Sequence, residues 1–274
     1  MPAMMRVHPK YFVPNAFTAL SMLFGLASMT MSAAGNFQLA AWMILWGVLL
    51  DKLDGTAARL MHASSEFGVQ FDSFADFVVF GIAPAGLFYF KLAPTFEGNR
   101  KLLLLAACGI FVVATATRLA RFNVSSPPGG DKIFYGIPTT LCGAFLASAF
   151  LTWDKYIPDR PELFRFLPGA LVVCGIAMVS NVRLPKLKPR KSKVFNLFQA
   201  VNIIAVYGCA ASMVLPEYML GLVFLYVSVG CTWAFLNPPA TDDEAPPPRR
   251  PLRLRLRRVR QTPGGRDSGH PHDL

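Results

Sequence analysis

Charged residues are scarce in this 274-residue chain: Asp, Glu, Lys and Arg make up 16% of it, whereas 53% of the residues are hydrophobic. Together with a mean hydropathy of +0.41, this balance excludes an ordinary soluble domain of the same size. The charge that is present is uneven, with a formal net charge of +11 at pH 7. A basic excess is typical of proteins that bind nucleic acid or an anionic membrane surface. The apolar bulk favours the membrane, so we expect a bilayer partner and no nucleic acid.

Histidine and cysteine are also sparse, with four and five residues. Each cysteine lies singly in an apolar run, without the spacing of a zinc site or a redox pair, which predicts small buried side chains. No convincing small-residue cleavage site follows the first apolar stretch, so we expect it to be a first helix and not a cleaved signal. The cysteines are Cys108, Cys142, Cys174, Cys209 and Cys231.

What the sequence does contain is a series of long apolar segments. A helix that crosses a hydrocarbon core of about 30 Å needs roughly 20 mostly apolar residues. Eight segments approach that length, which predicts an all-α fold, a polytopic membrane bundle of about eight transmembrane helices. The segments are Ala16–Ala34, Phe37–Leu60, Gly68–Tyr89, Lys101–Leu119, Thr139–Trp153, Leu167–Val182, Val194–Leu215 and Tyr218–Leu236.

The distribution of basic residues in the loops predicts the orientation, because Lys and Arg are retained on the cytoplasmic side. Most of the 27 lysines and arginines fall in one set of alternate loops. We therefore expect both termini to be cytoplasmic, as an even number of spans requires. The opposite set of loops contains only Lys91, Arg100, Lys101, Lys155, Arg160 and Arg165.

A change in composition after Asn237 predicts two regions. Residues 1–237 form the transmembrane domain, and residues 238–274 are rich in proline and arginine, which is typical of a disordered basic cytoplasmic tail. Attraction to anionic lipid headgroups is the simplest role for these arginines, with RNA or a protein partner as lesser alternatives. We expect the tail to be dispensable for chemistry.

The most informative stretch contains four aspartates on two consecutive segments. At about 100° per residue, each set of positions falls on one helix face, so two acidic stripes face inward from adjacent antiparallel helices. The first stripe consists of Asp51, Asp54 and Ala58, and the second of Gly68, Asp72 and Asp76.

The two acidic stripes also lie at one depth. Measured from the outer face at Phe37 and Tyr89, the rise to Asp51 is about 21 Å and the rise to Asp76 about 20 Å. That level is the cytoplasmic third of the bilayer core, where each lone charge costs a few kcal/mol. Two divalent cations would balance four carboxylates, and hard oxygen ligands suit Mg²⁺ or Mn²⁺ better than zinc. Such a site is also suited to bind a diphosphate.

Other interpretations of the four acids remain open on spacing alone. They could line a proton or cation pathway, or form salt bridges with Lys52 and Arg59. His62 falls in the loop between the two segments and matches neither stripe, so we expect it to face solvent. Gly55 and Gly68 would allow a bulky polar group to approach the backbone, and Arg59 could contact phosphate with two hydrogen bonds.

The order Asp-x-x-Asp-Gly-x-x-Ala-Arg, eight residues, Gly-x-x-x-Asp-x-x-x-Asp resembles the signature of the CDP-alcohol phosphatidyltransferases, and every defined position from Asp51 to Asp76 is present. The resemblance implies a transmembrane enzyme in which four aspartates hold two divalent ions. It implies that Asp76 is also the general base and that a further set of residues binds the CDP-lipid. The metal set is Asp51, Asp54, Asp72 and Asp76, and the CDP-lipid set is Asn15, Gly55, Ala58, Arg59 and Gly68.

Within the family, the segments around Arg118-Leu-Ala-Arg121-Phe-Asn123 and Gly136-Ile-Pro138 look like the phosphatidylserine synthases. That likeness implies transfer of a phosphatidyl group from CDP-diacylglycerol to L-serine, with release of CMP, by a homodimer in the inner membrane whose active site faces the cytoplasm. The same transfer to glycerol 3-phosphate or an inositol phosphate is the main alternative. An ion transporter and a non-catalytic membrane scaffold are remote ones.

Three residues of that segment are candidates for the acceptor site. Arg118 and Arg121 share one helix face at the cytoplasmic end of the fourth span. They are either orientation anchors or ligands for phosphate or the serine carboxylate, with Asn123 as a hydrogen-bond partner of the amino acid. Asn15 is either a helix cap or a contact to the nucleotide.

Overall fold

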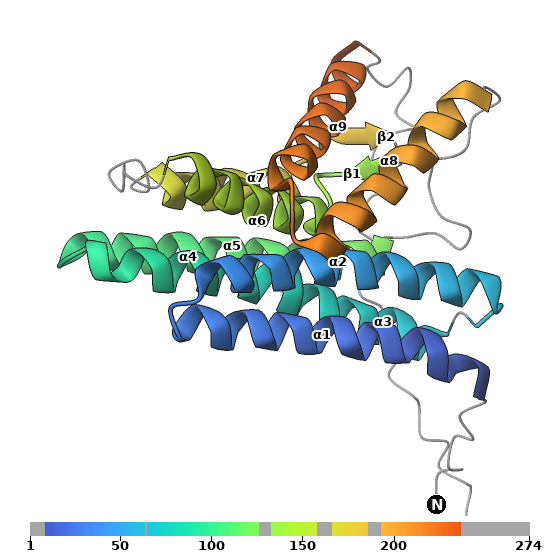
Figure 1. The fold of residues 1–274 in the computed structure, drawn as a ribbon, viewed down its shortest axis with the longest axis horizontal. Coiled ribbons are helices and arrows are strands. Elements are labelled where there is room, and N and C mark those ends of the chain that lie inside the picture. Colours follow the sequence, from blue (N-terminus) through green and yellow to red (C-terminus); the bar gives the residue numbers. More distant parts are fainter. Residues whose placement is uncertain (1–8, 64, 126–132, 158–165, 186–192, 237–274) are drawn as a thin grey trace, which may run out of the picture.

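The computed structural model describes residues 9–63, 65–125, 133–157, 166–185 and 193–236, and helices make up nearly all of this part of the chain (Figure 1). The predicted all-α fold is confirmed. The helices are α1 (Phe12–Ala33), α2 (Phe37–Leu60), α3 (Glu66–Asp76), α4 (Ala83–Leu92), α5 (Asn99–Ser125), α6 (Thr139–Tyr156), α7 (Leu167–Val179), α8 (Lys193–Ser212) and α9 (Pro216–Leu236). The tail predicted for residues 238–274 lies outside the described residues.

Each of the eight apolar segments forms a helix where the sequence predicts one. The second segment has the predicted bounds, Phe37 and Leu60. The third segment is one continuous rod in three parts, because the π-helical turn η2 (Phe77–Ile82) separates α3 from α4. Two short 3₁₀ turns flank the bundle helices, η1 (Pro9–Tyr11) and η3 (Ala93–Thr95).

A small antiparallel sheet was not expected from the sequence. Strand β1 (Ile133–Tyr135) pairs with β2 (Arg183–Pro185), so that Tyr135 lies opposite Arg183. Gly136 follows β1 with a φ of 75°, and an added Cβ would overlap the backbone carbonyl of Met178. Glycine is therefore required at this turn, which leads directly into α6.

Side-chain caps set the starts of the two helices that carry the aspartates. The Asn36 side chain accepts a hydrogen bond of 3.3 Å from the backbone N–H of Leu39 at the start of α2. Ser65 accepts one of 3.0 Å from the N–H of Gly68 at the start of α3. Each cap satisfies a backbone donor that has no partner within its own helix.

Small residues allow the helices around the acidic stretch to pack closely. Gly25 of α1 and Gly47 of α2 both lie against Val79 of the π-helical turn, and a Cβ at either position would crowd that side chain. Ser21 of α1 donates a hydrogen bond of 3.2 Å to the carbonyl of Gly47. Close backbone approach through small residues is the usual packing mode between helices in a membrane. It fixes α1, α2 and η2 relative to one another.

Four helical segments are long and apolar enough to cross a membrane by themselves, and many large apolar side chains are exposed, as lipid contact requires. The chain is therefore a membrane protein. Helix α2 has the length of a span but carries Asp51, Lys52, Asp54 and Arg59 near its end, and α7 is shorter. The total of eight spans and the cytoplasmic position of both termini stay predictions. The four segments are Phe12–Ala33, Glu66–Thr95, Asn99–Val124 and Pro216–Leu236.

Helices α8 and α9 are set at a steep angle to the helices of the main bundle in the view of Figure 1. Tyr207 of α8 donates a hydrogen bond of 3.4 Å to the carbonyl of Leu49 in α2, two residues before Asp51. Tyr218 of α9 donates one of 2.7 Å to the side chain of Asn202 in α8. These bonds join the two outer helices to each other and to the acidic end of α2.

Candidate metal and phosphate site

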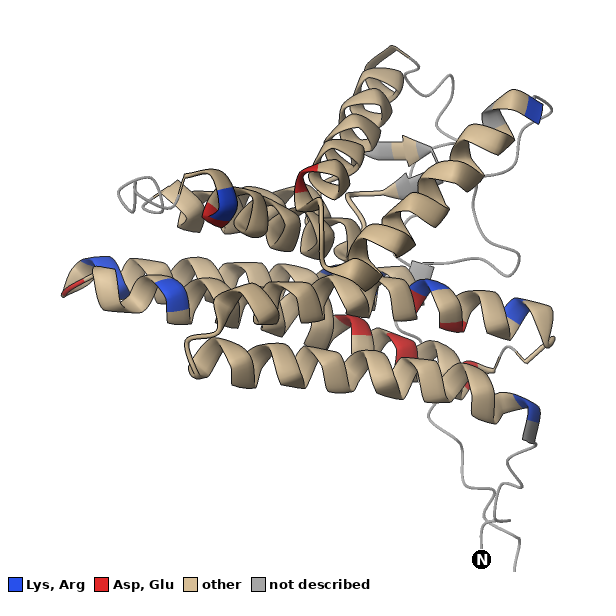
Figure 2. Ribbon diagram, viewed as in Figure 1, with Lys and Arg blue, Asp and Glu red and all other residues tan. Residues whose placement is uncertain are grey.

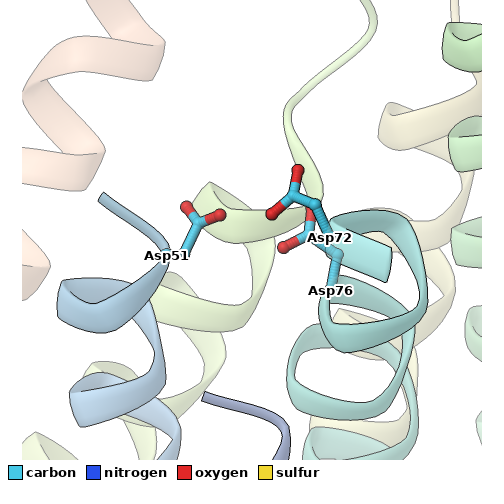
Figure 3. Close-up of side chains that lie close together, drawn as sticks. All are labelled: Asp51, Asp72 and Asp76. Carbon is cyan, nitrogen blue, oxygen red and sulfur yellow. The ribbon is translucent and has the colours of Figure 1, made fainter. Parts of the chain in front are cut away.

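Three carboxylates from two neighbouring helices converge in the bundle. Asp51 of α2 and Asp72 and Asp76 of α3 each place one oxygen within 4.8 Å of those of the other two. Figure 3 shows Asp51 directed from its helix toward the pair on α3, and Figure 2 shows that the acidic residues gather on facing stretches of these helices. All three residues are partly buried. Like charges this close repel each other, so the cluster needs a compensating cation or bound protons.

The fourth aspartate is directed differently. Asp54 is only 5% exposed, and its carboxylate accepts a hydrogen bond of 2.8 Å from Thr18 of α1. The Thr18 hydroxyl also lies 3.1 Å from the carbonyl of Pro14. Asp54 stays outside the group of three oxygens, although it lines the same hollow as Asp51 and Asp72. The structure thus brings together three of the four predicted metal ligands. The fourth, Asp54, is bonded instead to Thr18 of α1.

The π-helical turn begins directly after Asp76. Residues Phe77–Ile82 leave the regular α-helical hydrogen-bonding pattern, and regular helix resumes at Ala83. A π-turn adds a residue to one turn of helix and so rotates the flanking segments relative to each other. Here Asp72 and Asp76 lie on the part before the turn, while the part after it packs in the apolar core through Leu87 and Phe88. The turn thus lets Asp72 and Asp76 face the carboxylate cluster while the residues after it face the apolar core.

Asp76 has neighbours on two further helices. The hydroxyl of Thr139, the first residue of α6, lies 3.4 Å from Oδ2 of Asp76. Arg118 of α5 donates a long hydrogen bond of 3.5 Å to the same hydroxyl. Thr140 lies beside Asp51 and within hydrogen-bonding reach of it. The start of α6 therefore covers the acidic cluster on one side.

A hollow of about 200 Å³ opens next to the carboxylates. Gly55 contributes no side chain to it, and among the described residues beyond its own stretch of helix an added Cβ would meet only Arg59, at 3.5 Å. Arg59 is exposed and donates a hydrogen bond of 3.1 Å to Thr56 on its own helix, which leaves other donors of its guanidinium to reach outward. The lining residues are Asp51, Lys52, Asp54, Gly55, Arg59 and Asp72.

The remaining CDP-lipid candidates lie close to one another. The side-chain oxygen of Asn15 in α1 lies 3.5 Å from where a Cβ of Gly68 would be, so these two residues face each other across α1 and α3. Asn15 is partly buried and does not cap α1, because that helix begins at Phe12 after Tyr11. Ala58 is partly buried one turn beyond Asp54 on α2. Asn15 and Gly68 thus meet at the first turn of α3, and Asn15 lies on the same helix as Thr18, which bonds to Asp54.

The two arginines of α5 have different surroundings. Arg118 is 8% exposed, and its Nε has no hydrogen-bond partner among the described residues. Arg121 instead binds the turn after α7, where it donates to the carbonyls of Val179 at 3.0 Å and Ser180 at 3.3 Å. It also donates to the side chain of Asn181 at 3.3 Å. The sequence spacing predicts the same role for both arginines. In the structure only Arg118 lies toward Asp76.

Asn123 contacts α3 and not the carboxylate cluster. Its amide donates to Ser73 at 2.9 Å and to Gln70 at 3.3 Å, both on α3. Ser73 immediately follows Asp72, so Asn123 supports the acidic helix from α5. A role as direct ligand of an amino acid is not visible in these bonds.

Two buried threonines that bond to the aspartates are not among the residues that the sequence indicated. Thr18 and Thr139 are 4% and 1% exposed, and each donates to one of the aspartates. Thr139 follows the Gly136-Ile-Pro138 turn. The glycine and proline of this turn were a usable signal that a helix starts here. Thr18 had no such signal, because a threonine within an apolar helix most often bonds only to its own backbone.

The donor set of the cluster determines which chemistry it can perform. The atoms that Asp51, Asp72, Asp76 and Thr139 offer to a cation are all carboxylate or hydroxyl oxygens, and such hard oxygens favour Mg²⁺ or Mn²⁺ over zinc. Lys52 and Arg59 line the same hollow and supply positive charge for an anion. A site with cation ligands on one wall and cationic side chains on another fits a phosphate or diphosphate group.

Comparison with known proteins agrees with this chemistry. The family model described as CDP-alcohol phosphatidyltransferase matches residues 11–234. The chain is 33% identical over 232 residues to a CDP-diacylglycerol–serine O-phosphatidyltransferase of Helicobacter pylori. The aligned region covers 85% of this chain and 95% of the relative. It is 30% identical over 219 residues to the protein of the same name from Methanocaldococcus jannaschii. That aligned region covers 80% of this chain and 92% of the relative.

Proposed function

The chain belongs to the CDP-alcohol phosphatidyltransferase family, and from this premise we propose that it transfers the phosphatidyl group of CDP-diacylglycerol to the hydroxyl of L-serine. The products are phosphatidylserine and CMP. The observation that supports this function most strongly is the convergence of Asp51, Asp72 and Asp76 within 4.8 Å, beside a hollow that also contains Arg59. A diphosphate requires both features, a cation site and a basic wall.

The oxygen ligands around the cluster fit divalent ions. Asp51, Asp72 and Asp76 would hold one of them directly, and Asp54, which lines the same hollow, would contribute to a second. We propose two ions, Mg²⁺ or Mn²⁺, because four carboxylates carry a charge of −4. When bound, they supply positive charge that offsets the charge of the diphosphate and of the departing CMP.

The chain's own residues account for the binding of the lipid nucleotide. Gly55 leaves room beside α2, and Arg59 can donate to phosphate oxygens across that gap. Asn15, Ala58 and Gly68 complete the proposed CDP surface. The acyl chains would lie between helices in the cytoplasmic leaflet, so that the diphosphate reaches the carboxylates from the side.

The transfer requires a base, and Asp76 is the proposed one. One carboxylate oxygen takes the proton of the serine hydroxyl while the serine oxygen attacks the phosphatidyl phosphorus in line. The new phosphorus–oxygen bond forms as the bond from that phosphorus to the CMP oxygen breaks. CMP leaves with the electron pair of the broken bond, and Asp76 is left protonated.

Arg118 is the proposed anchor for the serine carboxylate. Its guanidinium is buried, lies next to Thr139 and Asp76, and has an Nε donor without a partner among the described residues. A buried donor without a partner costs free energy, and a carboxylate ligand would remove that cost through a charge-assisted hydrogen bond. Arg121 and Asn123 are better suited to hold the surrounding helices, because their donors are already in use. Arg121 donates to the end of α7, and Asn123 donates to α3.

Replacing Arg118 by Lys is therefore expected to raise the KM for serine by about 10- to 100-fold, because the fork of donors is lost. The KM for CDP-diacylglycerol is expected to stay within about threefold. Steady-state CMP release at varied serine concentration measures the effect. Arg121→Lys serves as the comparison and is expected to change the KM for serine less. An equal loss in both variants, or a change only in the KM for the lipid, would contradict the assignment.

One assay tests the proposed function itself. Purified protein is incubated with CDP-diacylglycerol and, in parallel, with labelled serine, glycerol 3-phosphate or an inositol phosphate. We expect CMP release and labelled lipid with serine. Labelled lipid with one of the phosphorylated acceptors alone would assign a sister transferase, and no CMP release with any acceptor would remove the activity.

The setting of the enzyme follows from the same proposal. We propose that residues 1–237 form the catalytic membrane domain and residues 238–274 a basic cytoplasmic tail. The acidic cluster would face the cytoplasm from the inner membrane, because most basic residues fall in the loops on that side. We further propose a homodimer, as the family resemblance implies.

A further inference from the structure

Thr139 contacts two of the proposed functional side chains at once. It is 1% exposed, and its hydroxyl lies 3.4 Å from Oδ2 of Asp76 and 3.5 Å from Nη1 of Arg118. The three residues come from α3, α5 and α6, so this hydroxyl is the point at which three helices meet beside the cluster. A threonine that only filled space would not need polar partners on both sides.

The direction of the two hydrogen bonds is fixed by the chemistry of the groups. A guanidinium has donors and no acceptor, so the Thr139 oxygen must accept from Arg118. The single hydroxyl hydrogen of Thr139 is then left for Asp76, which accepts it at Oδ2. One oxygen of Asp76, Oδ2, is thereby engaged by Thr139.

The backbone holds Thr139 in place independently of these two contacts. The N–H of Gly136 donates to the carbonyl of Val182 at 2.8 Å, and the N–H of Ile137 donates to that of Ala177 at 3.1 Å. Pro138 precedes the first turn of α6 in an extended conformation, with a ψ of 141°. The turn is anchored on α7 and on the residues that follow it, so the hydroxyl is presented from a fixed base.

We propose that Thr139 is a positioning residue for phosphatidyl transfer, whose hydroxyl holds the Asp76 carboxylate in register with Arg118. The proposal rests on the proposed function, because Asp76 and Arg118 have their roles only there. Thr139 touches neither the lipid phosphorus nor serine in this account. It keeps the group that takes the proton and the group that binds the serine carboxylate in one relative geometry.

The test compares Thr139→Val, which removes the hydroxyl at nearly constant volume, with Thr139→Ser, which keeps it. We expect kcat of the valine variant to fall about 10- to 100-fold, with the KM for CDP-diacylglycerol within about threefold of the original, because the hydroxyl orients Asp76 and Arg118 and lies outside the proposed CDP-lipid surface. The serine variant is expected to recover kcat to within about threefold.

A second readout needs no turnover. Asp76 is also a proposed metal ligand, so loss of its supporting bond is expected to weaken Mn²⁺ binding about 10-fold in the valine variant and little in the serine variant. Titration followed by electron paramagnetic resonance on the purified protein measures it. If the wild-type chain transfers nothing to serine, the proposed function fails, while this titration still decides on Thr139.

Thr115→Val is the matched control. Thr115 is a fully buried threonine of α5 whose hydroxyl bonds the carbonyl of Phe111 on its own helix and the sulfur of Met178, away from the cluster. We expect it to leave kcat and Mn²⁺ affinity unchanged. Unaltered kcat and Mn²⁺ binding in Thr139→Val would overturn the proposal. Equal losses in the valine and serine variants would also overturn it, since they would assign Thr139 to packing.

Discussion

Replacing Asp76 by Asn is expected to abolish phosphatidyl transfer, with at least about a 1,000-fold loss of CMP release, because the amide cannot take a proton and is a poor ligand for a hard cation. Asp76 lies within 4.8 Å of two other carboxylates, so removing one negative charge there also relieves repulsion. The protein is therefore expected to fold at least as stably as the original. Steady-state CMP release and thermal unfolding of the same preparation measure the two effects.

Asp154→Asn is a matched control for this variant, because it makes the same chemical change away from the cluster. Asp154 of α6 accepts a hydrogen bond of 2.8 Å from Gln38 and pairs with Lys91 at 3.5 Å. Its loss is expected to lower thermal stability slightly and to leave CMP release intact. Full activity in Asp76→Asn would remove Asp76 from the mechanism, and an equal loss in both variants would point to a general folding defect.

Removal of divalent ions is expected to reduce the activity to background, a loss of at least about 100-fold, because four carboxylates and a diphosphate cannot share one hollow without compensating positive charge. Addition of Mg²⁺ or Mn²⁺ after removal of the chelator is expected to restore CMP release. The measurement is the same assay, run with chelator at increasing concentration and then with each metal.

A control separates loss of metal from damage by the chelator. Chelator already saturated with Mg²⁺ is expected to leave the activity unchanged, while free chelator removes it. CMP release that persists after exhaustive chelation would contradict a metal-dependent transfer and would return the acidic stripes to a structural role or an ion pathway.

Most of the fold could be predicted from the sequence, because apolar segments of about 20 residues must form helices in a bilayer to satisfy their own backbone. Helix α2 begins and ends at the predicted residues. The π-helical turn Phe77–Ile82 could not be predicted, since the apolar pattern continues through it without interruption. The strands β1 and β2 have three residues each, too short for an alternating pattern to show.

The acidic site was predictable in outline and not in detail. Helical spacing placed Asp72 and Asp76 on one stripe and Asp51 opposite them, and these three carboxylates meet. The same spacing could not distinguish Asp54 from Asp51, because its direction depends on Thr18 of another helix. Long-range partners of this kind leave no periodic signal in the sequence.

The arginines of α5 illustrate the same limit. Arg118 and Arg121 share a helix face, which made them equivalent in the sequence. In the structure Arg121 donates to three oxygen atoms at the end of α7 and just after it, and Arg118 donates to Thr139 at the start of α6. Which arginine is available to a substrate depends on how α6 and α7 return to the bundle, and the sequence spacing carries no information on that.

We propose that aspartates of α2 and α3 jointly hold divalent ions beneath the headgroups of one leaflet. Anomalous diffraction from crystals of the protein grown with Mn²⁺ tests it most directly. We expect a manganese peak between the carboxylates of Asp51, Asp72 and Asp76, with Asp54 at or beside a second peak. Manganese bound elsewhere, or these carboxylates turned away from one another with no peak between them, would contradict it.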